Sequence, residues 1–326
     1  MSPQLVYAVC TWNRAGRLPR LLRAMRAQSC PVPFEVLVVD NNSTDGTREV
    51  VERIAAEQGG APVRYVFEPE QGIVPARNRA IEEAISAGAD YLVFIDDDEL
   101  PEPGLLEAAH DALAREGAAC VGGRILVPAD GLPAWIDPEL RAFLGEQDHG
   151  SHPFWVAGRD RPLWAGNIGY RMGLFREMSD LRFDTRYSRR GGEVGGGEDA
   201  VMFWTLLERG ARIRYRPDMV VRHEVDPARL RRRYFLRLHH AAGYRHGRYR
   251  LETRGRRVLG VPPFLLRQAA AFALRACGRA LAGRPALRVA MNAAYALGMA
   301  RGAHAAWRAA RGTPAGAPVR GREGEA

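Results

Sequence analysis

The first hundred residues alternate short apolar segments with longer amphipathic ones, and this order constrains the fold more than any other feature of the sequence. Strands buried on both faces are predicted at 5–10, 35–39, 63–67 and 91–95. Helices are predicted between them at 18–28, 46–58 and 75–87. Strands that alternate with helices in this way form parallel sheets with right-handed crossovers. The predicted fold class is therefore α/β, with a mostly parallel sheet flanked by helices.

The next hundred residues are less regular. A helix is predicted at 102–116, a strand at 119–125, an amphipathic helix at 198–209 and a strand-like segment at 212–221. Between them, residues 128–190 are rich in Gly, Pro, Trp and His. Such a segment is typical of loops that shape a substrate site, and equally of any irregular insertion.

Polar residues follow each of the four predicted strands. In an open parallel sheet, ligands bind outside the carboxyl ends of the strands. The polar groups are Thr11-Trp12-Asn13-Arg14, Asp40-Asn41-Asn42-Ser43, Glu68 and the Gln71-Gly72 turn with Arg77-Asn78, and Asp96-Asp97-Asp98-Glu99. Strand termination and helix capping explain any one group. They explain all four poorly, so the sequence predicts a ligand crevice at this edge.

The three adjacent aspartates after the strand at 91–95 indicate a cation. Their mutual repulsion is costly in a partly buried site unless a cation offsets it. Carboxylate oxygens favour Mg²⁺ or Mn²⁺, which proteins often share with substrate phosphates. A solvated acidic turn ahead of Pro101 is the alternative interpretation.

Two later features belong with this site. Gly195-Gly196-Gly197 precedes Glu198-Asp199, which begins a helix, and this predicts a flexible loop that closes over a bound donor. A plain surface loop and ordinary helix capping are the alternatives. His223 ends a strand beside the predicted metal site and is a candidate ligand, although a lone histidine is also common in a structural role.

Neither GxxxxGK[ST] nor a GxGxxG after the first strand is present, which disfavours a P-loop and a dinucleotide fold.

Charge divides the chain. Residues 1–228 contain 26 Arg against 35 Asp and Glu, whereas 229–326 contain 21 Arg against three Glu, and there is no lysine. We therefore predict a catalytic domain at 1–228, an Arg-rich helical extension at 229–311 and a disordered tail at 312–326.

The extension suits an anionic membrane surface, across residues 229–300. Nucleic-acid binding is not expected because no RNA-binding motif accompanies the arginines, and a helical cap on the acidic domain is the other alternative. No window reaches the roughly 20 apolar residues of a spanning helix, no signal peptide is recognisable, and the four cysteines form no CxxC pair. We expect a cytoplasmic protein, peripheral at the inner face of the plasma membrane.

Taken in order, these motifs resemble the family 2 glycosyltransferases of the GT-A fold, over about residues 4–225. The motifs are Thr11-Trp12-Asn13-Arg14, the run from Val38 to Thr47, Gly72 with Ala76-Arg77-Asn78, Asp96-Asp97-Asp98 and Gly197-Glu198-Asp199. Within the family, the chain is most similar to bacterial transferases of exopolysaccharide and cell-envelope assembly, of the succinoglycan glucosyltransferase type. Trp164-Ala165-Gly166-Asn167 is similar to the acceptor-side loop of that subgroup.

The resemblance implies roles for individual residues. Those expected to bind the nucleotide sugar are Thr11, Asn13, Arg14, Asp40, Asn42, Arg77 and Asp96. Asp96 and Asp98 form the DxD metal site, with His223 as a further ligand. Asp199 is implied to be the catalytic base, and Trp164, Asn167 and Glu198 lie on the acceptor side.

The expected activity is inverting, metal-dependent transfer from a nucleotide diphosphate sugar, with a UDP-sugar as the expected donor, to a hydroxyl of a glycan or lipid-linked acceptor. A scaffold that binds sugar nucleotides or lipids without turnover is one alternative. A nucleotidyltransferase is the other, but it would normally carry a Gly-rich loop with Lys or Arg after the first strand, and residues 11–17 contain one glycine.

Overall fold

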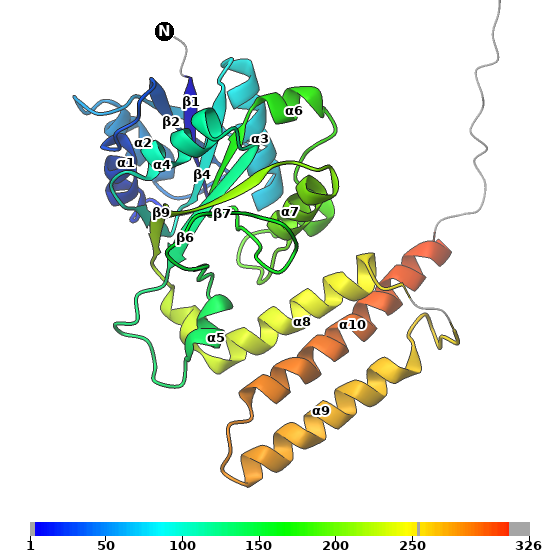
Figure 1. The fold of residues 1–326 in the computed structure, drawn as a ribbon. Helices are drawn as coiled ribbons and strands as arrows, with labels where there is room; N and C mark the ends of the chain where they lie inside the picture. The colour runs from blue at the N-terminus through cyan, green and yellow to red at the C-terminus, as the bar shows by residue number, and fades with distance from the viewer. Residues whose placement is uncertain (1–3, 253–254, 313–326) are drawn as a thin grey trace, which may run out of the picture. The chain divides into compact units, whose positions relative to one another are not determined.

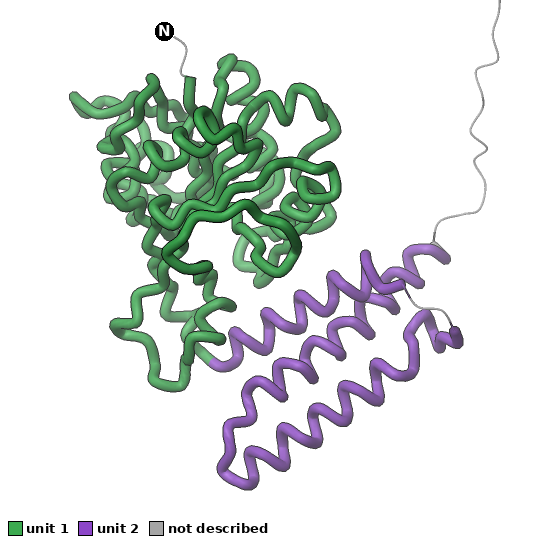
Figure 2. The backbone as a smooth tube through the Cα atoms, viewed as in Figure 1, with its two compact units in different colours: residues 1–231 green, residues 232–326 purple. Residues whose placement is uncertain are grey.

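A computed structural model describes residues 4–252 and 255–312 and divides the chain into two compact units, Met1–Arg231 and Arg232–Ala326 (Figure 2). The division lies three residues beyond the boundary predicted from charge. The first unit is an α/β domain, and the second is built from helices (Figure 1). The predicted disordered tail lies outside the described residues, apart from Gly312.

The N-terminal half of the first unit is the predicted parallel sheet. Its strands are β1 (Leu5–Thr11), β2 (Phe34–Asp40), β3 (Val63–Phe67) and β4 (Tyr91–Asp96). The crossover helices are α1 (Leu18–Arg26), α2 (Thr47–Ala55) and α3 (Ile73–Ser86). β1 lies between β2 and β4, and all three pairs in this half are parallel. Their carboxyl ends therefore meet at one edge.

The C-terminal half of the unit makes the sheet mixed. Its strands are β5 (Glu99–Pro101), β6 (Cys120–Leu126), β7 (Phe154–Trp155), β8 (Asn167–Arg171) and β9 (Ile213–His223). Its helices are α4 (Leu105–His110), which continues as a π-helical segment (Asp111–Arg115), α5 (Pro138–Ala142), α6 (Gly173–Glu177) and α7 (Glu198–Glu208). Two 3₁₀ turns (Thr185–Tyr187 and Pro227–Leu230) complete it. The strand order is β3-β2-β1-β4-β8-β6-β9-β5, and β7 pairs with β9.

Helices cover both faces of this sheet, as Figure 1 shows. Alternate residues of the central strands enter two separate cores, because successive strand side chains point to opposite faces. One core contains apolar residues of α1, α2 and α4, and the other contains those of α3, α6 and α7. The predicted α/β fold with flanking helices is thus confirmed.

Three predictions about individual elements need correction. β3 was expected to be buried on both faces, but it is the edge strand and is only half-buried, with Phe67 46% exposed. The helix predicted at 102–116 begins at Leu105 and ends in the π-helical segment. Residues 128–190 also contain β7, β8, α5 and α6, which the loose sequence pattern hid.

The second unit consists of α8 (Arg232–Tyr249), α9 (Pro263–Leu281) and α10 (Leu287–Gly312). α10 contacts both of the other helices. α8 and α10 approach closely at glycines: a Cβ added at Gly243 would lie 2.1 Å from the Tyr295 carbonyl oxygen, and one at Gly302 would lie 2.0 Å from that of Tyr244. Within the described residues, no helix is long and apolar enough to cross a membrane.

Candidate active site at the carboxyl ends of the strands

The loops after β1 and β2 are joined to each other at the nucleotide side of the predicted crevice. Thr11 and Asp40 end the two strands in register. The amide of Thr44 donates to Asn13 Oδ1 at 2.8 Å, which joins one loop to the other. Asn13 and Asn42 adopt positive φ angles of 52° and 62°, a conformation that asparagine tolerates well. The five residues predicted for nucleotide binding at these two strand ends therefore lie on segments that hold each other in place: Thr11, Asn13, Arg14, Asp40 and Asn42.

Asp40 itself is held in one orientation. It is 2% exposed, and its two carboxylate oxygens accept hydrogen bonds from the Ser43 amide at 3.0 Å and the Tyr65 hydroxyl at 2.8 Å. Burial, followed by the hydrogen bond to Asp40, raises the pKa of Tyr65, so that hydroxyl stays a donor. The carboxylate is thus preorganised at the edge of the sheet.

Asp97, the middle residue of the acidic run, faces β1. Its Oδ2 accepts a hydrogen bond from Thr11 Oγ1 at 2.8 Å, and Arg14 Nε lies 3.7 Å from its Oδ1. Burial, and after it the charge of Asp98, raises the pKa of Asp97 to about 6. Asp97 therefore links the first strand end to the fourth, a role that the sequence analysis did not assign.

Arg77 joins the fourth strand end to α7. Its side chain is 3% exposed; Nη2 donates to Asp96 Oδ1 at 2.9 Å and Nη1 to Glu198 Oε1 at 2.8 Å. Burial by itself would lower the pKa of Arg77, but the charges of Asp96, Glu198 and Asp199 outweigh burial and raise it. Hence one buried guanidinium connects α3, β4 and the predicted catalytic helix.

Asp199 lies at the start of α7. The helix follows Gly197, whose φ of 118° is readily available only to glycine, and the Ala200 amide donates to Asp199 Oδ1 at 2.7 Å. Burial, then the adjacent charge of Glu198, raises the pKa of Asp199 to about 6. A carboxylate with a pKa close to neutrality is well suited to accept a proton from a substrate hydroxyl. Glu198 is 3% exposed, and its Oε2 has no hydrogen-bond partner within the described structure.

Asp98 faces a different partner from Asp96. Its Oδ2 lies 3.4 Å from His223 Nε2 and 3.2 Å from Arg229 Nη2. Burial would raise the pKa of Asp98, but the hydrogen bond and charge of His223, together with the charge of Arg229, lower it well below its usual value. The arrangement follows from pairing of β5 with β9, which places Glu99 opposite His223.

The two predicted acceptor-side residues of the loop at 164–167 differ in burial. Trp164 is half-buried, and its amide donates to Gln147 Oε1 at 2.8 Å. Asn167 begins β8 and has no exposed surface; its Nδ2 donates to the Arg124 and Met219 carbonyls, each at 2.9 Å. Asn167 therefore joins β8 to β6 and β9 beneath the loop, rather than presenting its amide at the surface.

Two residues of the site had no role assigned from the sequence, although Glu99 was placed at the fourth strand end. Glu99 is 4% exposed, its Oε2 accepts the Asp96 amide at 3.1 Å, and burial followed by the charges of Asp96 and Asp98 raises its pKa well above the usual value. Four consecutive acidic residues were the pattern that could have revealed it. Arg229 was assigned to the basic extension, and a run of arginines offers no pattern that separates one member from the rest.

The donor set fits a divalent cation in part. Among the described residues, no group of three or more His, Cys, Asp and Glu side chains is arranged to hold a metal ion. Two of the three predicted ligands, Asp98 and His223, are 3.4 Å apart, a separation that two ligands of one ion can have, while Asp96 is bound by Arg77. Mg²⁺ commonly uses one or two protein ligands and completes its shell with water and substrate phosphates, so the pair suits an ion shared with a diphosphate.

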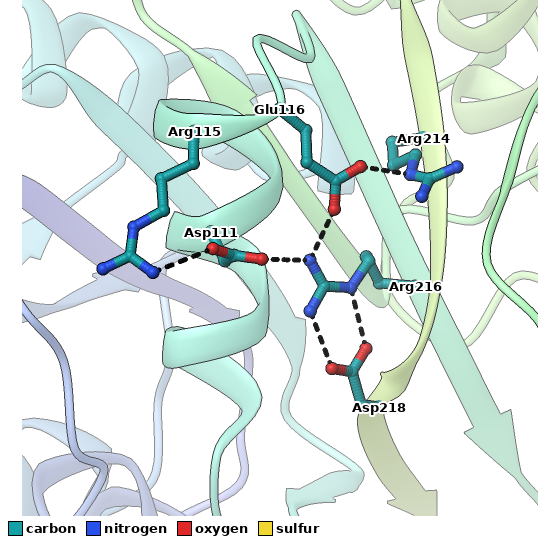
Figure 3. Close-up of polar contacts among 6 residues, drawn as sticks. All are labelled: Asp111, Arg115, Glu116, Arg214, Arg216 and Asp218. Atoms are coloured by element: carbon teal, nitrogen blue, oxygen red, sulfur yellow. Dashed lines mark hydrogen bonds and ion pairs between the residues drawn. The ribbon is translucent and has the colours of Figure 1, made fainter.

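A second ionic cluster lies on β9 and the π-helical segment (Figure 3). Arg216 Nη1 lies 2.7 Å from Asp111 Oδ2 and 2.8 Å from Glu116 Oε1, and its Nη2 lies 2.8 Å from Asp218 Oδ2. The hydrogen bonds that Arg216 donates to Asp111 and Asp218 are the main cause that lowers the pKa of each of these carboxyl groups. Each carboxylate in this cluster has a cation.

Comparison with known proteins identifies the family. Residues 7–179, more than half of the chain, match the family model described as "Glycosyl transferase family 2". The chain belongs to family 2 of the glycosyltransferases. It is 27% identical over 243 residues to the succinoglycan biosynthesis protein ExoM of Rhizobium meliloti, covering 74% of this chain and 73% of that protein. It is also 37% identical over 84 residues to ExoA of the same organism, covering 26% and 24%. The predicted similarity to the succinoglycan type is thus confirmed.

Solved structures agree on the fold of this family 2 member. The mannosyltransferase PcManGT from Pyrobaculum calidifontis, in complex with GDP-Man and Mn²⁺, has a TM-score of 0.60 at 21% identity, covering 93% of this chain and 87% of that one. TarS 1–349 of S. aureus, in complex with UDP-GlcNAc, has a TM-score of 0.51 at 18% identity, covering 76% and 68%. Both are glycosyltransferase folds, as the sequence predicted.

Proposed function

We propose that this family 2 member is an inverting, metal-dependent transferase that moves a sugar from a nucleotide diphosphate sugar to a hydroxyl of a glycan or lipid-linked acceptor. The observation that carries the proposal is the buried Arg77, which connects the acidic end of β4 to the helix of Asp199. Similar proteins named for succinoglycan biosynthesis support a role in polysaccharide or cell-envelope synthesis. The neighbours with GDP-Man and UDP-GlcNAc support a nucleotide-sugar donor, and a UDP-sugar is our expectation.

The donor side is the joined pair of loops after β1 and β2. Thr11, Asn13, Asp40 and Asn42 would contact the nucleoside there. Arg14 and Arg77 place positive charge beside the acidic run, where a diphosphate needs it. The hydrogen bonds between these loops would hold the donor in one orientation before the reaction. Such orientation supplies much of the rate acceleration in a two-substrate transfer.

The acidic run supplies the cation site. Asp98 and His223 would hold Mg²⁺ or Mn²⁺, with Asp96 as the predicted third contact. A bound divalent ion neutralises the charge that develops on a departing diphosphate. Arg229 Nη2, 3.2 Å from Asp98 Oδ2, offsets part of the negative charge there.

Asp199 is the base in this proposal. Its carboxylate accepts the proton of the acceptor hydroxyl as that oxygen attacks the anomeric carbon from the face opposite the diphosphate, which inverts the configuration. Glu198 and Trp164 lie on the acceptor side, and Asn167 positions the loop from beneath. Gly195 to Gly197 form the hinge in front of the base.

A ligand screen tests this function. Thermal unfolding of the purified protein is measured with UDP-, GDP- and other nucleotide sugars, each with Mn²⁺, with Mg²⁺ and with neither, because a ligand that binds only the folded state raises its stability. We expect stabilisation by one donor class that requires the metal and is lost in Asp98→Ala. Release of nucleoside diphosphate by the stabilised protein distinguishes a transferase from a non-catalytic scaffold, and absence of both effects overturns the proposal.

We propose that the basic second unit associates with an anionic membrane surface, at the inner face of the plasma membrane. In the described residues it contains arginines throughout α8, α9 and α10 and a single acidic residue, Glu252. Such a surface is attracted to anionic lipids. This placement would bring a lipid-linked acceptor to the enzyme.

A further inference from the structure

α9 exposes an apolar side that no other part of the described unit covers. Leu265 and Ala276 are its buried residues, and Leu265 belongs to an apolar cluster with Ala300 of α10. On the other side, Leu266, Leu274 and Leu281 are 54%, 74% and 90% exposed. A single exposed leucine is common on a protein surface. Three exposed leucines along one side of a helix without acidic residues form an apolar strip.

The same helix ends in a hollow lined by arginines. The turn between α9 and α10 forms an open depression of about 420 Å³, with Arg275, Arg279 and Arg284 in its lining. The Nε of Arg279 donates to the Pro285 carbonyl oxygen at 2.7 Å, which fixes the direction of that guanidinium. Three guanidinium groups around one hollow are chemically suited to a phosphate group, because the planar guanidinium matches phosphate geometry.

The charged side chains of α9, α10 and the segments next to them are all positive. Residues 255–312 contain ten arginines and no Asp or Glu. The hollow lies within one helical turn of Leu281, the most exposed leucine of the apolar strip. α9 thus has an apolar strip on one side and, at its C-terminal end, a basic hollow on the side that carries Arg275 and Arg279. This is the composition of a helix that lies in a bilayer interface, with its polar side at the headgroups.

We propose that α9 and the α9–α10 turn are a docking surface for anionic phospholipid: Leu266, Leu274 and Leu281 enter the acyl region, and the hollow of Arg275, Arg279 and Arg284 binds a lipid phosphate. The proposal rests on the membrane association proposed above and assigns it to one helix side. In this proposal α9 lies along the membrane surface, with its leucines toward the acyl chains.

Two other occupants fit this surface less well. A second copy of the chain would bring the three arginines of the hollow against another three, and the resulting repulsion opposes such a contact. Nucleic acid would be bound through aromatic side chains that stack on bases. The exposed strip consists of leucines, with Phe264 at one end only.

The experiment measures co-sedimentation of the full chain with vesicles of phosphatidylcholine alone and of phosphatidylcholine mixed with phosphatidylglycerol. We expect the wild type to bind the anionic vesicles and not the neutral ones. Leu274→Gln with Leu281→Gln should weaken binding at least tenfold, and so should Arg275→Gln with Arg284→Gln. Leu297→Gln is the matched control, since Leu297 is 47% exposed on α10, and it should bind within about twofold of the wild type.

The outcomes separate the docking surface from the rest of the function. If both double variants bind anionic vesicles as well as the wild type does, this docking surface is refuted even though the unit binds membrane elsewhere. If the wild type binds neither vesicle, or self-associates through the same leucines without lipid, the proposal is overturned. Donor-dependent thermal stabilisation, measured without vesicles, should be the same in all variants, so a failure of the transferase proposal is seen independently.

Discussion

The two ionic clusters of the first unit contain the same residue types and differ in charge balance. Around Arg216, each of three carboxylates has a guanidinium partner, and the pKa of Asp111 and of Asp218 is lowered (Figure 3). Around Arg77, the three carboxylates of Asp96, Glu198 and Asp199 share one buried guanidinium, and the pKa of Asp199 is raised to about 6. Balanced pairs stabilise a fold, whereas a surplus of buried carboxylates is costly and persists where a ligand or a reaction uses it.

The largest effect should come from removing Asp199, the proposed base in the unbalanced cluster. Asp199→Asn keeps the shape of the side chain and removes its proton acceptor, so we expect kcat to fall by about 10²–10⁴-fold, the usual contribution of a positioned general base. Donor binding, measured by thermal shift, should change little. Asp90→Asn, at the exposed opposite end of β4, is the matched control and should leave kcat unchanged. Normal turnover of Asp199→Asn would remove this residue from the mechanism.

Next in size is the loss of the central cation. Arg77→Met leaves Glu198 buried without its partner and Asp96 without its nearest cation, so the free energy of unfolding should fall by about 3–5 kcal/mol. Denaturant unfolding measures this loss, and donor-dependent stabilisation should disappear as well. A variant that is less stable but still binds the donor normally would show that Arg77 is structural only.

The balanced cluster should respond differently. Arg216→Gln should lower the free energy of unfolding by about 1–3 kcal/mol at pH 7 and leave kcat and donor binding as they are. Because the folded pKa values of Asp111 and Asp218 are lowered, their stabilisation is present above the unfolded value of 3.8 and is lost as the pH falls below it. The difference between wild type and variant should therefore shrink below about pH 3.8. A difference that stays constant with pH would mean that packing of the side chain, and not its charge, matters.

The first half of the fold could be predicted from sequence because its strands are apolar on both faces and alternate regularly with helices. The second half could not, since β7 and β8 are short and lie within a Gly- and Pro-rich segment, and their pairing depends on distant strands. Residues 63–67 look like a central strand, but their place at the sheet edge follows from the strand order, which the pattern does not contain.

For the candidate site, the sequence could place residues at strand ends but could not pair them. Asp96 and Asp98 are two residues apart, and the chain turns between them, so that one meets Arg77 and the other meets His223 and Arg229. Arg229 is 131 residues from Asp98 in the chain, and its contact exists only because β9 returns beside β5. Long-range pairing of this kind leaves no local pattern.

The smallest effect concerns how the unbalanced cluster sets the pKa of Asp199, the proposed base. With Asp199 as the base, kcat/KM should fall about tenfold per pH unit below about pH 6, because the protonated carboxyl cannot accept a proton. After burial, the charge of Glu198 is the main cause of the raised pKa, and the charge of Arg77 opposes it. Glu198→Gln removes the negative charge of Glu198 and keeps the positive charge of Arg77. The acidic limb of the pH profile should therefore move to lower pH. Glu193→Gln, at an exposed acidic residue of the same loop, should leave the limb in place. A limb that moves upward in Glu198→Gln would instead mean that Glu198 keeps Arg77 where it stabilises the ionised base.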